Sequence, residues 1–317
     1  MNILMVNERI AKRTGTEIVA RDMSLGLAAR GNSIAILTAE RGDLADEIEA
    51  AGVDVHTDPA TVSFTPDIIH FNDLALAERT TKAFADTPAM LQWHRFVERD
   101  FSIDGTRITS VVGVSRRIVE KISSYTGIET DGVFNNYVDL TRFEPRRHPL
   151  PDKPRKWLLV GQQKRGYTLL AKLAAVALSK GVILHTAGPR YFSRVDNLPQ
   201  TCAKYDLVFA SGRCALEAAC AGAGVVVTDF NGVGGFLDGS NVSWFYNGNF
   251  SFRSFKAPVS ARALNQAIAD YRPEGAAETT RWLRENADLQ VGIGRLLEIY
   301  ERARHRSEPP RVPALIS

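Results

Sequence analysis

Cysteine is scarce in this 317-residue chain, and its distribution excludes several kinds of site. The three cysteines, Cys202, Cys214 and Cys220, are an odd number with no CxxC pair and no histidine at metal-ligand spacing. The six histidines are scattered and form no HExxH motif. We therefore expect reduced cytoplasmic thiols, no disulfide, no metal site and no metal-dependent hydrolysis.

Long apolar runs are also missing. No stretch reaches the roughly 18–20 apolar residues that a membrane span needs, and the opening MNILMVNERI lacks the layout of a signal peptide. No basic run is interleaved with aromatic residues, so no nucleic-acid partner is expected. With 44% hydrophobic residues, the chain is expected to be a soluble cytoplasmic protein of two domains.

Charge is unevenly spread along the chain. Residues 1–150 carry 17 Lys and Arg against 22 Asp and Glu, and the remainder carries 22 against 14, which gives net charges of −5 and +8. A basic C-terminal half suits an anionic ligand such as a nucleoside diphosphate, and ordinary solvated surface charge explains it equally well. The acidic first half argues against strong docking on an anionic membrane and leaves weaker peripheral contact open.

Apolar runs of strand length alternate with helical patterns through most of the sequence, which predicts an α/β chain with two doubly wound, Rossmann-like domains. The proline-rich, basic stretch FEPRRHPLPDKPRK interrupts this rhythm. We expect a first domain over residues 1–145, a linker over 146–155, a second domain over 156–304 and a flexible tail over 305–317. Two such domains enclose a cleft, and ligands sit off the carboxyl ends of the strands.

The predicted helices follow from the same patterns. In the first half they cover residues 16–30, 43–51, 74–85 and 115–125; in the second they cover 167–180, 212–222, 260–270 and 276–304. The segment 229–256 is rich in Gly, Asn and aromatic residues and is expected to be a long ordered loop region.

The stretch VFASGRCALEAACAGAGVVVTD, residues 208–229, predicts a strand, a turn, a helix and a strand. Ser211 and Gly212 form the turn, and a helix N-terminus there offers amides and a dipole that can hold a phosphate. Glu217 is the one acidic residue among small neighbours, so it needs a partner if it is buried. A glutamate on the exposed face of the helix is the ordinary alternative.

This stretch resembles the signature of retaining GT-B glycosyltransferases of the group 1 kind (glycosyltransferase family 4). The signature is Glu-Gly-Phe-Gly, four residues, Glu-Ala, three residues and Gly-x-Pro-Val, and its matching positions here are Gly212, Glu217, Ala218, Gly222, Val225 and Val226. The resemblance implies that Glu217 binds the ribose hydroxyls of the donor, since two planar acceptor oxygens suit a vicinal diol. It also places Gly161, Ser211, Gly212 and Arg213 in the donor site.

Three positions depart from the family pattern. Phe209 stands where the family has its first Glu and cannot hydrogen-bond sugar hydroxyls, and Gly224 stands where it has Pro. After the first strand of the second domain the chain reads VGQQKRGY, so Gln162 replaces the family's phosphate-binding Arg, and Lys164 and Arg165 are the cations left to stabilise the leaving diphosphate. Alternatively, Lys164 and Arg165 are ordinary solvent-exposed residues of a loop. Too few residues separate HTAGP from KYDLVFA for a further strand and helix, so the second domain is expected to be shortened.

Resemblance extends over nearly the whole sequence. After the first strand, Thr14, Gly15, Thr16 and Glu17 resemble the family's Gly-Gly-x-Glu loop. Gly15 would let amides reach a donor phosphate, with an ordinary strand-to-helix turn as the alternative. The C-terminal stretch RWLRENADLQVGIGRLLEIYERA resembles the family's last helices, the final one of which crosses back to the first domain.

Two histidines stand at predicted strand ends, in DIIHFND and AMLQWHRF. They match positions where the family often has histidine. His94 corresponds to the one near the donor sugar, where an imidazole can donate to a hydroxyl or support the transition state, so it is the candidate catalytic residue with Lys164 and Arg165. For His70 we expect a packed or capping role.

The resemblance implies a cytoplasmic hexosyltransferase. It would move a sugar from a nucleoside-diphosphate donor to a glycan, lipid-linked or small-molecule hydroxyl acceptor, with retention, in glycan or polysaccharide biosynthesis. No cofactor or metal is expected, because amides and cations can neutralise the leaving diphosphate. One alternative is a non-catalytic nucleotide-sugar-binding or partner subunit, which Phe209 and Gln162 favour. A nucleotide-sugar epimerase is another, although no suitable acid/base array is found. The donor base and sugar, the acceptor and the oligomeric state stay open.

Overall fold

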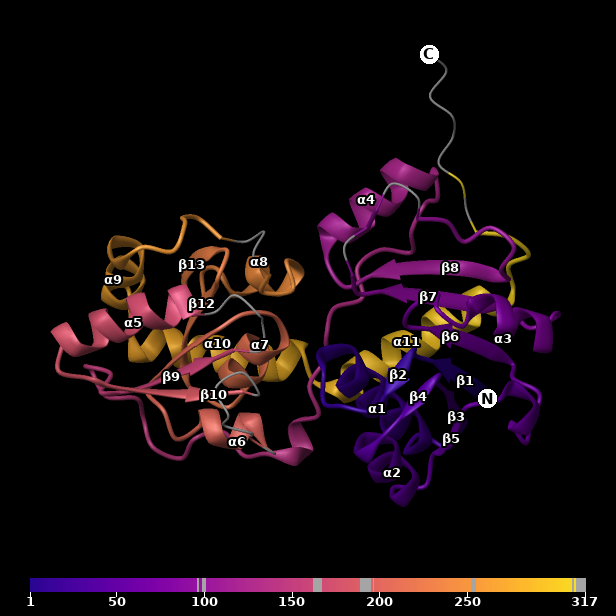
Figure 1. Ribbon diagram of the computed structural model, residues 1–317, viewed down its shortest axis with the longest axis horizontal. Helices are drawn as coiled ribbons and strands as arrows, with labels where there is room; N and C mark the ends of the chain where they lie inside the picture. The colour runs from indigo at the N-terminus through magenta and orange to yellow at the C-terminus, as the bar shows by residue number, and fades with distance from the viewer. Residues whose placement is uncertain are drawn as a thin grey trace, which may run out of the picture. The chain divides into compact units, whose positions relative to one another are not determined.

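The computed structural model describes residues 1–95, 97–98, 101–161, 167–188, 195, 197–251, 255–309 and 311. The chain divides into two compact units. The first contains residues Met1–Tyr137 together with Leu289–Ser317, and the second contains Val138–Asp288. Each has its own sheet covered by helices, as Figure 1 shows. No described helix is both long and apolar enough to cross a bilayer.

A parallel sheet forms the centre of the first unit, as the continuous apolar runs predicted. Its described strands have the order β5-β3-β1-β6-β7-β8. Their bounds are β1 (Asn2–Val6), β3 (Ser33–Leu37), β5 (Asp54–His56), β6 (Ile68–Phe71), β7 (Ala89–Trp93) and β8 (Ile108–Gly113). The chain moves outward from β1 on one side and from β6 on the other, so the strand order reverses between these two. Ligand sites of open α/β sheets lie at such a reversal.

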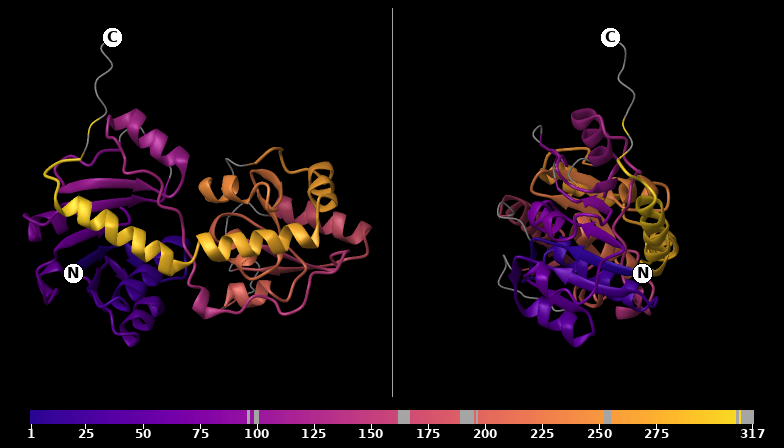
Figure 2. Two further views of the ribbon diagram at one scale, coloured as in Figure 1. Left: turned by 180° about the vertical axis from the view of Figure 1, so that it is seen from behind. Right: turned by 90° about the vertical axis from the view of Figure 1, so that its right-hand side faces the viewer.

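Helices cover both faces of this sheet. They are α1 (Gly15–Ala28), α2 (Asp43–Ala50), α3 (Ala77–Ala83), α4 (Arg116–Thr126) and α11 (Leu289–Arg304), and a short parallel pair, β2 (Arg9–Ile10) and β4 (Glu40–Arg41), lies beside them. Helices α1 and α11 share one face, where Met5 and Met90 pack with Leu296 and Tyr300. Figure 2 shows α11 running along the sheet of its own unit.

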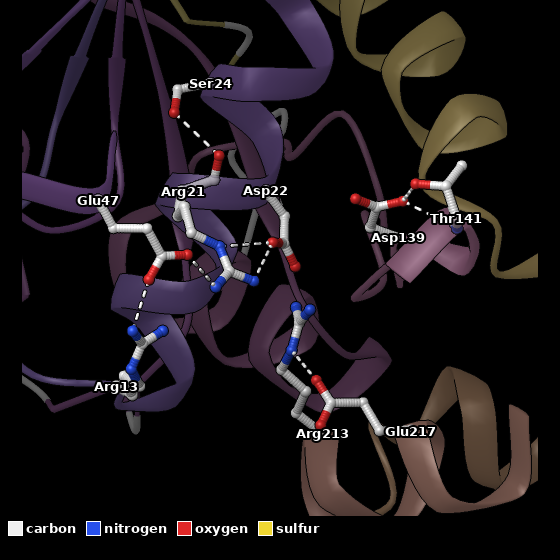
Figure 3. Close-up of polar contacts among 9 residues, drawn as sticks. All are labelled: Arg13, Arg21, Asp22, Ser24, Glu47, Asp139, Thr141, Arg213 and Glu217. Atoms are coloured by element: carbon white, nitrogen blue, oxygen red, sulfur yellow. Dashed lines mark hydrogen bonds and ion pairs between the residues drawn. The ribbon is translucent and has the colours of Figure 1, made fainter. Parts of the chain in front are cut away.

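A charged network connects α1 to α2 (Figure 3). Arg21 is 2% exposed and donates to Asp22 through both Nε and Nη2, and through Nη1 to Glu47 at 3.1 Å. Arg13 pairs with the same Glu47. Because a buried guanidinium without a carboxylate is strongly unfavourable, this network fixes the two helices against each other.

The C-terminal helix α11 is joined to the sheet by polar contacts as well as by apolar packing. His70 Nδ1 lies 2.7 Å from the Tyr300 hydroxyl, and the Thr109 hydroxyl donates to the Ala303 carbonyl at 2.8 Å. Burial lowers the pKa of His70 from 6.5 to about 3, and the nearby Gln92 side chain opposes this shift. His70 is therefore a packed, neutral histidine, as expected.

Acid is expected to destabilise the protein through His70. The unfolded chain binds a proton at this residue below pH 6.5, whereas the folded chain does so near pH 3, so stability is lost as pH falls through that window. The slope is about 1.4 kcal/mol per pH unit. Denaturant unfolding between pH 7 and 5 should show it, and His70→Gln should reduce the slope whereas exposed His305→Gln should not. An unchanged slope in His70→Gln would contradict the assignment.

The second unit has a five-stranded described sheet in the order β10-β9-β11-β12-β13. Its strands are β9 (Lys156–Val160), β10 (Ile183–Ala187), β11 (Leu207–Ala210), β12 (Gly224–Asp229) and the antiparallel β13 (Gly232–Phe236). The described helices are α5 (Tyr167–Ser179), α6 (Leu198–Cys202), α7 (Gly212–Cys220), α8 (Val242–Asn247), α9 (Ala261–Ala269) and α10 (Pro273–Asn286). The strand order reverses between β9 and β11. In the described part, β10 is the outer strand beside β9.

Two features of the second unit differ from the sequence interpretation. The segment 229–256 contains β13 and α8, and is not one long loop. The GVGGF sequence of β13 carries three glycines and so lacks the alternation that indicates a strand. The prediction of a single helix over 276–304 was also wrong. Helix α10 ends at Asn286 and α11 begins at Leu289, and the break between them is where the chain passes from one unit to the other.

The first and last residues of the second unit pair with each other, although they are far apart in the sequence. The Val138 amide donates to the Ala287 carbonyl at 2.9 Å, and Val138 also pairs with Asp288. Residues 138–145, which we expected in the first domain, belong to the second unit, since Val138 and Phe143 pack in its core. Asp139 fixes the turn that follows, by accepting from the Thr141 amide at 3.0 Å (Figure 3).

Candidate functional site

The start of α7 is bonded to a second segment of unusual backbone conformation. Gly212 has φ +57°, a conformation that favours glycine, and its amide donates to the Phe250 carbonyl at 2.8 Å. Phe250 and the preceding Asn249 are non-glycine residues with φ of 47° and 55°. Such backbone is held only where surrounding contacts enforce it, and it occurs often at functional sites. Since this amide is used internally, Gly212 contributes the shape of the turn and not a donor to phosphate.

Glu217 lies on α7 and is 13% exposed at its side chain. Its Oε1 accepts from Arg213 Nε at 2.7 Å, one helical turn earlier (Figure 3). The expected donor-binding residues Arg213 and Glu217 are therefore brought together as an ion pair, and Glu217 is not on a solvent-facing side of the helix. A largely buried carboxylate beside a single guanidinium nitrogen can still accept from a diol.

Phe209 is fully buried in β11, where its ring packs 5.4 Å from Trp157 between centroids. It belongs to the core and offers no substitute for a polar side chain. Asp229, which ends the neighbouring strand β12, is the carboxylate that sequence reasoning missed. It accepts from the Asn231 amide at 2.6 Å and from the Ser211 hydroxyl, and burial raises its pKa despite these bonds. An acidic residue directly after a buried strand was the available signal.

Gly161 follows β9, beside the point where the strand order of the second sheet reverses. Its carbonyl lies against Gly188, where an added Cβ would come within 2.2 Å of the Gly161 oxygen, and Gly188 has φ +124°. The ends of β9 and β10 thus approach as closely as glycine allows. Gln162, Lys164 and Arg165, which come next in the chain, lie outside the described residues.

In the first unit, Glu17 shapes the loop before α1. Its carboxylate accepts from the amides of Ala11, Lys12 and Thr14 at 2.9–3.0 Å, and Glu17 is 3% exposed. The family-like Glu is therefore a structural residue of this loop. Gly15 begins α1, and an added Cβ there would meet nothing within 4 Å, so its surroundings do not require glycine.

His94 follows β7, and its Nε2 lies 3.0 Å from Oδ1 of Asn72, which follows β6. Asp73 and Arg95, which follow Asn72 and His94 in the chain, both bond to Glu8 in the loop after β1. Asp73 accepts from the Glu8 amide at 2.8 Å, and Arg95 donates to the Glu8 carboxylate at 2.9 Å. Burial raises the pKa of Asp73, and Arg95 holds the pKa of Glu8 below its usual value. The loops after β1, β6 and β7 are thus one bonded group.

The expected site residues fall into two groups, each within its own unit. Gly161, Ser211, Gly212, Arg213 and Glu217 gather at the carboxyl edge of the second sheet. Gly15 is the first residue of α1 in the other unit, and His94 lies at the carboxyl edge of the first sheet. Sequence reasoning missed Asn72, Asp73 and Asp229, single polar residues after strands that form no spaced motif.

Solved structures supply the comparison that decides the fold. A glycosyltransferase from Rickettsia africae ESF-5 is 15% identical with a TM-score of 0.68, and the alignment covers 96% of this chain and 99% of that one. Anabaena Alr3699/HepE in complex with UDP-glucose is 16% identical with a TM-score of 0.62, over 95% and 100% of the two chains. The lipopolysaccharide outer core galactosyltransferase WaaB, in its apo form, is 14% identical with a TM-score of 0.60, over 95% and 99%.

The chain has the GT-B fold. This confirms the predicted α/β class with two Rossmann-like units, and at these identities it shows the fold alone. No family model and no curated protein sequence matches the chain.

Proposed function

We propose that this protein is a glycosyltransferase that moves a sugar from a nucleoside-diphosphate sugar to a hydroxyl acceptor. The Arg213–Glu217 pair carries the proposal. It holds a carboxylate in place on α7, the helix that begins where the strand order of the second sheet reverses. The Anabaena protein with the same fold was crystallised with UDP-glucose. A cytoplasmic role in glycan or polysaccharide biosynthesis, transfer of a hexose and retention of configuration are the finer parts of this proposal and follow from the family resemblance.

The predicted site residues have distinct roles in the proposed reaction. Glu217 accepts hydrogen bonds from the ribose diol, and Arg213 keeps its carboxylate oriented. The first turn of α7 directs its dipole at the diphosphate, and Lys164 and Arg165 are the proposed cations that stabilise the leaving group. Gly15 and Gly161 allow close approach of phosphate, and His94 hydrogen-bonds the sugar. No cofactor is required by this scheme, in which the nucleotide sugar is a substrate.

A non-catalytic nucleotide-sugar-binding subunit is the second candidate function, and the buried position of Phe209 favours it. The family's first Glu is replaced by a core residue, so contacts to the donor sugar would be fewer. Asp229 is a carboxylate on the adjacent strand, tied to the Ser211 hydroxyl at the start of the same turn, and its presence favours the enzyme.

Incubation with UDP-, GDP-, ADP- and dTDP-sugars distinguishes the two. A glycosyltransferase should release free nucleoside diphosphate slowly from one of these donors, because water replaces the missing acceptor. We expect release from at least one donor in a coupled nucleotide assay, and slower release by Glu217→Ala at low donor concentration because the donor binds more weakly. A thermal shift with nucleotide but no release would support the binding subunit, and neither response from any donor would contradict both.

A further inference from the structure

Three side-chain amides form a buried row across the carboxyl edge of the first sheet. Val6 of β1 pairs with Phe71 of β6, and Phe71 pairs with Leu91 of β7. The next residues along these strands are Asn7, Asn72 and Gln92, which are 2%, 1% and 0% exposed. Three carboxamides therefore follow one another on adjacent strands, beside the place where the strand order reverses.

Several polar atoms of this row have no hydrogen-bond partner among the residues that the structure describes. They are Asn7 Oδ1, Asn72 Nδ2 and both polar side-chain atoms of Gln92. Each such atom loses its hydrogen bonds to water when the chain folds, and folded proteins keep few of them. Packing stability alone therefore does not account for three amides in this buried row.

Asn72 is the member of the row that bonds a candidate reactive side chain. Its Oδ1 lies 3.0 Å from His94 Nε2. A carboxamide oxygen can accept but cannot donate, so the proton of this bond belongs to Nε2. In the neutral ring the lone pair is then on Nδ1. The partner of one ring nitrogen thus decides what the other can do.

We propose that Asn72 is a positioning residue that holds His94 as the Nε2–H tautomer and fixes the direction of its ring. Asn72 does this without touching substrate. The proposal deepens the proposed function, and rests on it for the statement that His94 serves the reaction.

Burial makes Asn72 suited to this role. Its side chain is 1% exposed and follows a central strand directly, while the neighbouring Asp73 is bonded to the amides of Glu8 and Ala75. The amide therefore has little freedom to swing away. Since the two terminal atoms of an Asn side chain point apart, the bond from Oδ1 turns Nδ2 away from His94.

Nitrogen-15 NMR of the histidine rings tests the proposal on the full chain. His94 signals are assigned by their loss in His94→Gln. In the natural protein we expect a nitrogen-bound proton on Nε2 that exchanges slowly with water, and no proton on Nδ1 at pH 8. Asn72→Asp retains an acceptor oxygen and should retain this signal, whereas Asn72→Leu should lose it to fast exchange.

Gln92→Leu is the matched control, because Gln92 is in the same row, equally buried and not bonded to His94. It should leave the His94 signal unchanged and preserve or raise the melting temperature. Circular dichroism verifies that each variant is folded, and Asn72→Asp decides the question if Asn72→Leu is not. A proton on Nδ1, or an Nε2–H signal that survives in folded Asn72→Leu, would overturn the proposal.

Kinetics with the donor sugar tests the link to the reaction. Asn72→Leu should lower the rate of nucleotide release about tenfold at saturating donor and leave the donor KM within about twofold, with Asn72→Asp between the two. Unchanged turnover in Asn72→Leu would overturn the positioning role. An inactive natural protein would reject the proposed function instead, and the ring signals would still decide whether Asn72 sets the tautomer.

Discussion

Replacing Glu217 with alanine is expected to weaken binding of the nucleotide donor by about 10- to 100-fold. A hydrogen bond to a charged group contributes roughly 1.5–3 kcal/mol, and each 1.4 kcal/mol is a factor of ten in Kd. The carboxylate is 13% exposed, and one of its oxygens accepts from Arg213. A ribose diol would therefore bind it where little water competes for the hydrogen bond. Isothermal titration with the donor that releases nucleotide measures the effect.

Two further variants separate this effect from a loss of structure. Glu274→Ala removes an exposed glutamate of α10 and should leave the affinity unchanged. Glu217→Gln keeps the shape of the side chain and one acceptor oxygen, so its affinity should lie between those of the natural protein and Glu217→Ala. An affinity within twofold of the natural protein for folded Glu217→Ala would remove Glu217 from the donor site.

Gly292→Ala is expected to destabilise the first unit by about 1–3 kcal/mol, the usual cost of overpacking a dense core. An added Cβ at Gly292 would be 2.4–2.8 Å from three ring carbons of Tyr137, a residue that is 2% exposed. Neither the ring nor α11 can move freely, because Arg295 also donates to the Tyr137 hydroxyl at 2.7 Å. Urea unfolding measures the change.

Gly294 provides the control on the same helix. An added Cβ there meets nothing within 4 Å, so Gly294→Ala should stabilise the protein by up to about 1 kcal/mol through helix propensity. Opposite signs for the two substitutions would show that the Tyr137 contact, and not the loss of a glycine, destabilises the chain. Equal and small effects would mean that Tyr137 can move aside.

The sequence predicted the parallel sheets because strands buried on both faces are continuously apolar, and NILMV, DIIHF and KWLLVG carry that signal without ambiguity. It did not predict β13, whose glycines remove the pattern, or the break between α10 and α11. Both of those helices are amphipathic, and the break follows from contacts of residues 138 and 287, far apart in the chain.

Candidate site residues could be proposed from the sequence where they belong to a spaced motif. The spacing made Gly212 and Glu217 candidates, and the Arg213–Glu217 pair is an i,i+4 contact that helix geometry permits. Asn72 and Asp229 could not be assigned a role, because their significance depends on which strands lie beside theirs. The internal use of the Gly212 amide depends on the backbone of Phe250 and was equally beyond the sequence.

The first unit is made of two separate chain segments, and this has a practical consequence for dividing the protein into fragments. Residues 138–288 form one uninterrupted segment and can be excised as a single gene fragment, in which the Arg213–Glu217 pair and its sheet are retained. The first unit cannot be excised in this way, because its residues come from both ends of the chain. A product that stops at residue 288 would leave Met5, His70 and Met90 without the helix that covers them, and a bare apolar sheet face of this kind favours aggregation.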